Sequence, residues 1–257
     1  MTTDTLPSPY EAPELYDLVL DGFRDDLPFW LEEAKAGDGP VLEVACGTGR
    51  VLLHLLDHGI DGDGVDLAPR MLERLRAKAV ARDRKARVEL ADMRDFTMPR
   101  RYRRVFIAFN GFAHCDSVDD QLRCLRCCRE HLEPGGALVV HMSYPSVAYW
   151  AEPDGGRVLE GEVRHPETGL PVRMWDTRTK DRVGQHQDSL TEIELLDAHG
   201  QVAEIHRFQT RQRWVYRFEM ELLLQLAGFA RTGFFGGWDR RPLATDTDQM
   251  LAFGWKD

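Results

Sequence analysis

The sequence lacks an apolar run of the roughly 20 residues that a membrane-spanning helix needs. Basic residues are in the minority, with 33 Lys and Arg against 43 Asp and Glu, which gives a formal net charge of -10. An acidic surface repels the phosphates of nucleic acids, so this charge disfavours a DNA or RNA substrate. Residues 1–10 are polar and contain two prolines, unlike a secretory signal sequence. We therefore expect neither a membrane nor a nucleic-acid partner.

Cysteine is scarce, and its five copies are an odd number. Three of them, Cys124, Cys127 and Cys128, lie in one segment of helical periodicity. A Cys-x-x-Cys pair can bind zinc, but a structural zinc site needs four ligands and the sequence holds no second pair. We predict that these thiols pack in the core, that no metal is bound, and that the protein works in the reducing cytoplasm.

The length of 257 residues suits one α/β domain with an insertion. Apolar runs that predict buried strands alternate with helical segments over the first 145 residues, a pattern typical of a doubly wound parallel sheet. Helical periodicity also covers Glu11 to Lys35, before the first strand. The predicted strands of this sheet span residues 41–45, 62–67, 87–91, 104–109 and 137–142.

The pattern changes after the fifth predicted strand. Short segments of alternating polarity at 157–163, 189–195 and 204–214 predict antiparallel strands, and residues 197–200 (Asp-Ala-His-Gly) form a hairpin-turn signal. A helix is predicted at 218–226, followed by two strands at 230–236 and 249–255. The chain thus carries an antiparallel β insertion after the fifth strand.

The turn after the first strand is the clearest functional signal. Gly47 and Gly49 separate the strand from the next helix, so the backbone can approach a ligand and the helix N–H groups can bind polar atoms. The dinucleotide fingerprint needs a third glycine three residues later, where Leu52 stands. The phosphate loop of nucleotide hydrolases needs Gly-Lys-Ser/Thr, but Arg50 and Val51 follow Gly49. Both phosphate-binding interpretations therefore fail.

Acidic residues follow the next two predicted strands. Asp66 ends the second strand about 20 residues after the glycine turn, where a carboxylate can accept hydrogen bonds from both hydroxyls of a ribose. Asp92 follows the third strand within Asp-Met-Arg-Asp-Phe, residues 92–96. A loop of solvated charges is the alternative, and Met93 and Phe96 disfavour it.

The turn resembles the first motif of the class I S-adenosylmethionine (SAM)-dependent methyltransferases, acidic-x-Gly-x-Gly-x-Gly. Glu43, Ala45, Gly47 and Gly49 occupy its positions, with Ala45 in place of the first glycine. Residues 92–96 resemble small-molecule N-methyltransferases of this family, including those that dimethylate amino sugars. The resemblance covers about residues 10–145. It implies a Rossmann-like sheet of seven strands with an antiparallel edge hairpin, SAM as cofactor and S-adenosylhomocysteine (SAH) as product.

The resemblance also implies roles for single residues. Asp66 would bind the ribose, Asp92 would accept the adenine amino group, and Met93 would pack on the ring. An N-terminal helix often folds over the cofactor as a lid with a Tyr-Asp pair, which Tyr16 and Asp17 match; the alternative is a helix that only packs on the sheet. The predicted cofactor-binding residues are Tyr16, Glu43, Ala45, Cys46, Gly47, Gly49, Asp66, Leu67, Met71, Asp92, Met93, Phe109 and Asn110.

The resemblance also implies a division of the chain into three regions. Residues 1–36 would form the helical lid, residues 37–145 and 218–257 the SAM-binding domain, and residues 146–217 an insertion that covers the substrate. Candidates for lining the substrate pocket in or beside the insertion are His165, Arg178, His186, Arg211, Arg213 and Tyr216.

The loop after the fourth strand should lie near the reacting methyl group, because ligands bind at the carboxyl ends of such strands. It lacks the Asn/Asp-Pro-Pro-Tyr/Phe motif of enzymes that methylate bases or glutamine, and the strand-end aspartate of metal-dependent catechol enzymes. His114 on this loop is the predicted general base, because imidazole titrates near neutral pH. The alternative is a loop histidine without a catalytic role. Tyr144 is a second catalytic candidate, for orienting the substrate.

The sequence thus predicts a SAM-dependent methyltransferase that acts on a small-molecule acceptor, with an amine favoured over a hydroxyl. A homodimer is compatible with this prediction. One alternative is a small-molecule O-methyltransferase. Two others belong to different classes: a non-catalytic SAM-binding protein and a nicotinamide-dependent oxidoreductase.

Overall fold

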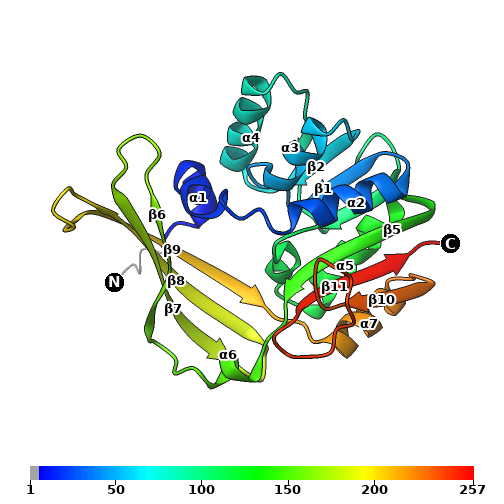
Figure 1. Cartoon of the computed structure of the whole chain (residues 1–257). Coiled ribbons are helices and arrows are strands. Elements are labelled where there is room, and N and C mark those ends of the chain that lie inside the picture. Colours follow the sequence, from blue (N-terminus) through cyan, green and yellow to red (C-terminus); the bar gives the residue numbers. More distant parts are fainter. Residues whose placement is uncertain (1–5) are drawn as a thin grey trace.

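The apolar runs of the sequence form one large sheet in the computed structural model, which describes residues 6–257. Its strands are β1 (Val41–Val44), β2 (Gly62–Asp66), β3 (Arg87–Leu90), β4 (Tyr102–Ile107), β5 (Leu132–Ser143), β10 (Arg231–Phe235) and β11 (Gln249–Trp255). The seven strands have the order β10-β11-β5-β4-β1-β2-β3, and β11 runs in the direction opposite to the other six (Figure 1). This arrangement confirms the predicted Rossmann-like fold with an antiparallel edge hairpin.

The described residues form seven α-helices, some of which cover the two faces of this sheet. They are α1 (Pro13–Leu20), α2 (Leu27–Gly37), α3 (Arg50–Asp57), α4 (Pro69–Ala81), α5 (Val118–Glu130), α6 (Val147–Ala151) and α7 (Arg217–Leu226), with two short 3-10 helices, η1 (Pro9–Glu11) and η2 (Gly111–His114). Val105 and Ile107 of β4 belong to a core shared with α5 and α7, whereas Phe106 belongs to a core shared with α2 and α3. A strand segment that is buried on both faces is apolar at successive positions, and Val105 to Ile107 of β4 form such a run in the sequence.

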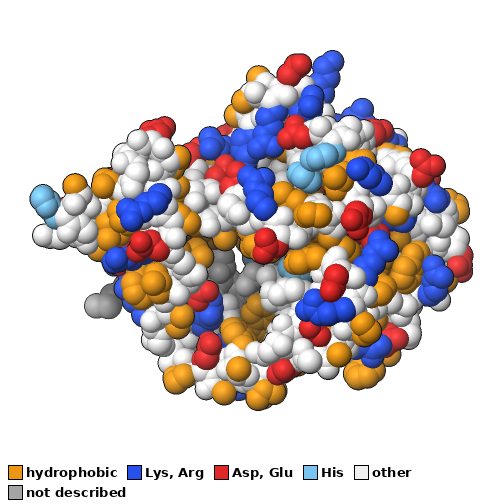
Figure 2. Space-filling view, viewed as in Figure 1, with side chains coloured by type: hydrophobic (Ala, Val, Ile, Leu, Met, Phe, Trp, Pro, Cys, Tyr) orange, Lys and Arg blue, Asp and Glu red, His pale blue; other side chains and the backbone are white. Residues whose placement is uncertain are grey.

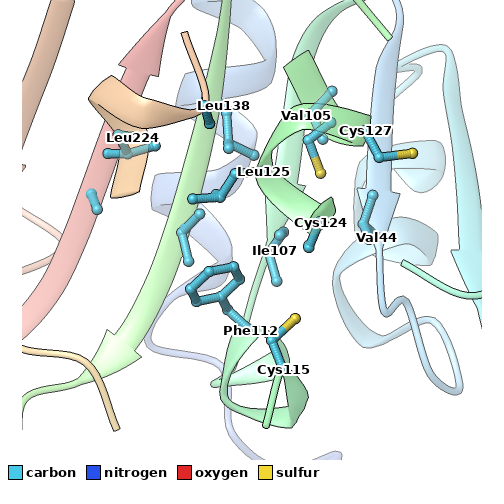
Figure 3. Close-up of a cluster of buried hydrophobic side chains, with 14 of the residues drawn as sticks. Val44, Val105, Ile107, Phe112, Cys115, Cys124, Leu125, Cys127, Leu138 and Leu224 are labelled. Atoms are coloured by element: carbon cyan, nitrogen blue, oxygen red, sulfur yellow. The ribbon is translucent and has the colours of Figure 1, made fainter. Parts of the chain in front are cut away.

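The cysteines pack in the core, as predicted. All five are free and buried. Figure 3 shows Cys115, Cys124 and Cys127 among the apolar side chains between β4 and α5. Among residues 6–257, no cluster of three His, Cys, Asp or Glu side chains is placed to hold a metal ion.

The insertion forms a second, antiparallel sheet, on the left of Figure 1. Its strands, in spatial order, are β6 (Arg157–Arg164), β7 (Pro171–Asp181), β8 (His186–Leu196) and β9 (Val202–Arg213). The sequence did not predict β7. Polar residues such as Asp176 and Arg178 occupy its inward positions, so the alternation of apolar and polar residues that marks a strand is absent there.

The N-terminal segment differs from the prediction of one helical stretch over Glu11 to Lys35. It forms two helices, α1 and α2, which are separated by residues 21–26. Asp26 is buried at the start of α2, where it accepts hydrogen bonds from Trp30 and Arg50. The break allows α1 to leave the large sheet and pack its Leu15, Leu18 and Val19 against the second sheet.

An ion network fixes the second sheet to the first. Arg213, at the end of β9, donates to Gln121 of α5 and to Glu219 of α7, both at 2.8 Å. Arg213 is 8% exposed, so these hydrogen bonds are largely shielded from water.

Among the described residues, no helix has the length and hydropathy to cross a membrane.

His141 of β5 makes the stability of the fold depend on pH. It is 3% exposed, bonds Gln249 at 2.8 Å, and burial lowers its pKa to about 4. The unfolded chain binds a proton near pH 6.5 and the folded chain does not, so the free energy of unfolding should fall as pH drops from about 6.5 to about 4. The loss should approach about 3 kcal/mol.

We predict that His141→Gln weakens this pH dependence, as measured by urea unfolding at pH 7.5 and at pH 5. The control His199→Gln, at an exposed hairpin turn, should retain it. An unchanged pH dependence in His141→Gln would contradict the assignment.

Candidate functional site

Two cavities meet where the order of the large sheet reverses, between the carboxyl ends of β1 and β4. The strand-end cavity, of about 390 Å³, lies over the loops that follow β1, β2 and β3. The inter-sheet cavity, of about 520 Å³, lies between these loops and the second sheet. Figure 2 shows the surface hollowed between the two parts of the molecule. Tyr10, Tyr16, Leu20, Phe109 and His114 line both cavities and form their junction.

The loop after β1 forms one wall of the strand-end cavity. Gly47 lines the cavity with φ of 53°, and a Cβ there would meet only the methyl carbon of Met71, at 3.5 Å. Gly49 lies at the start of α3, where a Cβ would lie 2.7 Å from Leu75 Cγ. Gly49 therefore allows α3 and α4 to approach each other and does not itself line the cavity. Ala45 also has a positive φ, of 58°, which costs an L-residue about 1 kcal/mol.

The side chain of Glu43 in β1 stabilises this loop by a hydrogen bond to α3. Its carboxylate is buried and accepts a hydrogen bond of 2.8 Å from the backbone N–H of Leu52, in the first turn of α3. Burial raises the pKa of Glu43 to about 8. Cys46 and Met71 complete this side of the cavity.

Asp66 is held by two backbone groups at the end of β2. Its Oδ2 accepts from the N–H of Gly47 at 2.7 Å, and its Oδ1 accepts from the N–H of Ala68 at 2.8 Å. Burial raises the pKa of Asp66, and these hydrogen bonds oppose the shift. Each oxygen retains a further lone pair for a ligand. Leu67 beside it lines the cavity and is 63% exposed.

Asp92 and Met93 line the opposite end of the cavity, after β3. Arg94 donates to both oxygens of Asp92 and also to Asp120 at the start of α5. This guanidinium lowers the pKa of Asp92, so its carboxylate stays ionised and fixed in place.

Helix α1 closes the strand-end cavity and is fastened by one carboxylate. Asp17, 9% exposed, accepts from Thr48 at 2.5 Å, from Arg74 at 2.8 Å and from Lys78 at 3.0 Å. These three donors come from the glycine turn and from α4. Tyr16, the neighbouring residue, lies at the junction of the cavities.

The junction contains an acid–base pair. The hydroxyl of Tyr10 lies 2.7 Å from Nε2 of His114. Desolvation raises the pKa of Tyr10 and lowers that of His114. At neutral pH the phenol is therefore protonated and the imidazole neutral. Tyr10 was not among the predicted site residues; its only sequence signal is its position shortly before Tyr16.

The inter-sheet cavity contains the remaining candidates from the large sheet. Asn110, with φ of 62°, accepts from the backbone N–H of Ser143 at 2.6 Å and lines this cavity rather than the strand-end cavity. Tyr144 lines it too and packs edge-on against Tyr216.

Of the candidates in or beside the insertion, only Arg178 lines the inter-sheet cavity. His186 and Arg211 bond Asp116, and Arg213 belongs to the network between the sheets. His165 accepts from a backbone N–H in the turn after β6. These residues hold the second sheet together or attach it to the first.

Comparison with known proteins finds methyltransferases that are similar to this chain. Residues 41–136 match the model of a methyltransferase domain. The chain is 29% identical to the cypemycin N-terminal methyltransferase of a Streptomyces species, over 95% of this chain and 96% of that protein. It is 34% identical to the dTDP-3-amino-3,6-dideoxy-alpha-D-glucopyranose N,N-dimethyltransferase of Streptomyces fradiae, over 51% of this chain and 52% of that protein. The solved structure of the CcbJ methyltransferase from Streptomyces caelestis superposes with a TM-score of 0.79 and 27% identity, covering 97% and 98% of the two chains.

We predict that Asp17→Ala frees α1, because Arg74 and Lys78 would lose their shared partner. Hydrogen–deuterium exchange followed by mass spectrometry should show faster exchange at the α1 amides than in the parent protein. Asp25→Ala, at an exposed position just after α1, serves as the control and should leave these amides protected. Equal protection of α1 in all three proteins would show that Asp17 does not fasten it.

Proposed function

The chain is a class I SAM-dependent methyltransferase, and on this basis we propose that it methylates an amine nitrogen of a small-molecule acceptor. One observation carries the proposal: the strand-end cavity opens into the inter-sheet cavity at the Tyr10–His114 pair. The names of two relatives support the amine, since one is an N-terminal methyltransferase and the other an N,N-dimethyltransferase of a dTDP-linked amino sugar.

We assign SAM to the strand-end cavity, because its residues suit each part of that molecule. The fixed carboxylate of Asp66 would bind the ribose hydroxyls. Asp92 would accept from the adenine amino group, while Met93 and Leu67 would contact the ring. Gly47 leaves room for a close approach to the backbone.

The other predicted residues fall into supporting roles in this proposal. Glu43 and Gly49 would shape the turn, and Asn110 would position the loop after β4. Cys46 and Met71 would supply apolar contacts, with Ala45 and Phe109 closing the wall. Of the expected lid at residues 1–36, residues 1–5 lie outside the described residues, and the rest would cover the cofactor. Residues 37–145 and 218–257 would form the cofactor domain, and residues 146–217 would cover the substrate.

Bound SAM supplies a methyl group already activated by its positively charged sulfur. The protein needs to hold the acceptor nitrogen in line and to exclude water. Helix α1 and the second sheet would do both, because they enclose the junction from two sides. A nitrogen that gains a methyl group must release one proton, and the neutral His114, hydrogen-bonded to Tyr10, is placed to accept it. Tyr144 would orient the acceptor from the floor of the inter-sheet cavity.

The same pair favours an amine over a hydroxyl. A neutral amine carries its lone pair without help, whereas a hydroxyl gains more from a strong base. His114 is a weak base because desolvation lowers its pKa.

The nicotinamide-dependent alternative is wrong, because the chain belongs to the methyltransferases, in agreement with Leu52 at the third glycine position. The other alternative, a non-catalytic SAM-binding protein, would be excluded by measured turnover.

We also keep two predictions from the sequence. Five free, buried cysteines support work in a reducing cytoplasm. A homodimer is supported by Phe218, Leu222 and Leu226, an apolar stripe on α7 with exposures of 70%, 58% and 64%. Analytical ultracentrifugation would test the dimer, and a monomer at micromolar concentration would reject it.

Asp66→Asn should weaken SAM binding by about ten- to a hundredfold, because a hydrogen bond to a charged group contributes about 1.5–3 kcal/mol. Calorimetric titration of the purified protein with SAM, SAH and NAD measures this. Asp119→Asn, an exposed residue of α5, is the matched control and should bind SAM normally. Unchanged affinity in Asp66→Asn would reject its ribose role, and binding of NAD alone would reject the cofactor.

His114→Ala should lower kcat by about tenfold or more while SAM affinity stays within twofold, because a positioned base acts on the proton transfer and not on the cofactor. Tyr10→Phe, which keeps the ring, should cause a smaller loss. Mass spectrometry with a panel of amines and alcohols provides the assay. His199→Ala is the control. If His114→Ala retains full turnover, His114 is not the base.

A further inference from the structure

The inward face of the second sheet changes character along its length. Beside α1 it is apolar, with Val172, Ile193 and Phe208 in one buried cluster. Farther along the same strands it becomes polar and lines the inter-sheet cavity. We call this part the polar wall; its members are Glu160, Asp176, Arg178, Gln187, Ser189, Thr191, Thr210 and Gln212. Inward positions of a sheet are normally apolar, so a polar wall there requires partners.

One acceptor atom of the polar wall has no partner. Gln187 is 4% exposed, and its Nε2 donates to Ser189 at 2.7 Å. Its Oε1 is buried and makes no hydrogen bond within residues 6–257. An unmet buried acceptor costs about 1–3 kcal/mol, so a ligand that donates a hydrogen bond here would remove that penalty.

The charges of the polar wall also select a ligand. Arg178 donates to Asp176 at 2.7 Å and contacts Glu160 at 2.7 Å. Asp176 receives one more, longer hydrogen bond, of 3.3 Å from Thr191. Arg178 is the only Lys or Arg among the described residues that line this cavity, and two carboxylates face it. The wall therefore carries one excess negative charge and no cation left over for an anion.

We infer that the acceptor presents hydrogen-bond donors, and no phosphate or other anionic group, to Asp176 and Gln187 at the end opposite to its reacting nitrogen. This inference deepens the proposed function and rests on it. The proposed acceptor is an uncharged or cationic amine that also carries hydroxyl or further N–H groups. A phosphate in this cavity would lose its water and meet net negative charge, which is unfavourable. The chain would thus differ from relatives that methylate nucleotide-linked amino sugars.

The test compares two forms of one amino sugar, the methyl glycoside of 3-amino-3,6-dideoxyglucose and its dTDP-linked form. Methylation is followed by mass spectrometry with the full chain and SAM. We expect kcat/KM to be at least tenfold higher for the phosphate-free form. A preference for the dTDP-linked form would overturn the inference.

Two variants test the named residues. Asp176→Asn and Gln187→Leu should each raise KM for the glycoside about fivefold or more, with SAM affinity unchanged. Asp176→Asn should also reduce the discrimination against the dTDP-linked form. The controls are Asp188→Asn and Gln209→Leu, which lie on neighbouring strands outside the cavity. If both wall variants behave like their controls, the inference is wrong.

A binding measurement separates this inference from the proposed function. Trp214 lines the inter-sheet cavity, so its fluorescence should report an acceptor that enters the SAH complex. If neither form binds at millimolar concentration, the inference fails, while methylation of any other amine in the panel preserves the proposed function. Methylation of acceptors that carry phosphate or carboxylate, in preference to uncharged ones, would also overturn it.

Discussion

The carboxylate of Asp17 joins parts of the chain that would otherwise be independent. It brings the glycine turn, α4 and α1 together through Thr48, Arg74 and Lys78. Because the carboxylate is buried, removal of its partners would leave an uncompensated charge at a cost of about 3–5 kcal/mol. The opposite side of α1 packs on the second sheet. One ion cluster therefore sets the position of the helix that encloses both cavities.

The position of α1 explains why the two cavities meet at so few residues. The loop after β4 approaches from the large sheet, and η1 approaches from the N-terminal side. Tyr10 and His114 face each other across this gap at 2.7 Å. Their shifted pKa values have a common cause, since both lose water when α1 and η1 are in place. The packing that encloses this junction is thus also the packing that shifts the two pKa values.

The parts of the structure that depend on backbone geometry could be predicted from the sequence. Gly47, Asp66 and Asp92 each follow a strand of the same parallel sheet, and the carboxyl ends of such strands share one edge. Their meeting in one cavity follows from strand order alone. The break between α1 and α2 was missed because the apolar periodicity continues through it, although Gly22 after α1 and Pro28 in the first turn of α2 mark it. Asp26, at the start of α2, is buried in a tertiary ion pair with Arg50 that no pattern in the sequence indicates. Periodicity describes burial, and it does not show where a buried charge will find its partner.

The second sheet was harder to predict for a related reason. Its inward positions on β7 and β8 carry Asp176 and Gln187, so the two-residue period that marks a strand is lost where the cavity begins. An apolar face would have been easier to recognise and more stable, since buried polar atoms require partners. Local conflict between pattern and fold is expected at functional sites.

The two sheets differ in how much sequence change the residues around their cavities tolerate. The large sheet forms its cavity from turns and strand ends that tolerate little change, since a Cβ at Gly49 would lie 2.7 Å from Leu75 Cγ. The second sheet presents side chains from ladders that are held by backbone hydrogen bonds, whatever side chains they carry. A substitution on its inward face would change the lining of the cavity and leave those ladders intact. The lining of the inter-sheet cavity could therefore change at a smaller cost in stability than the turn after β1 could.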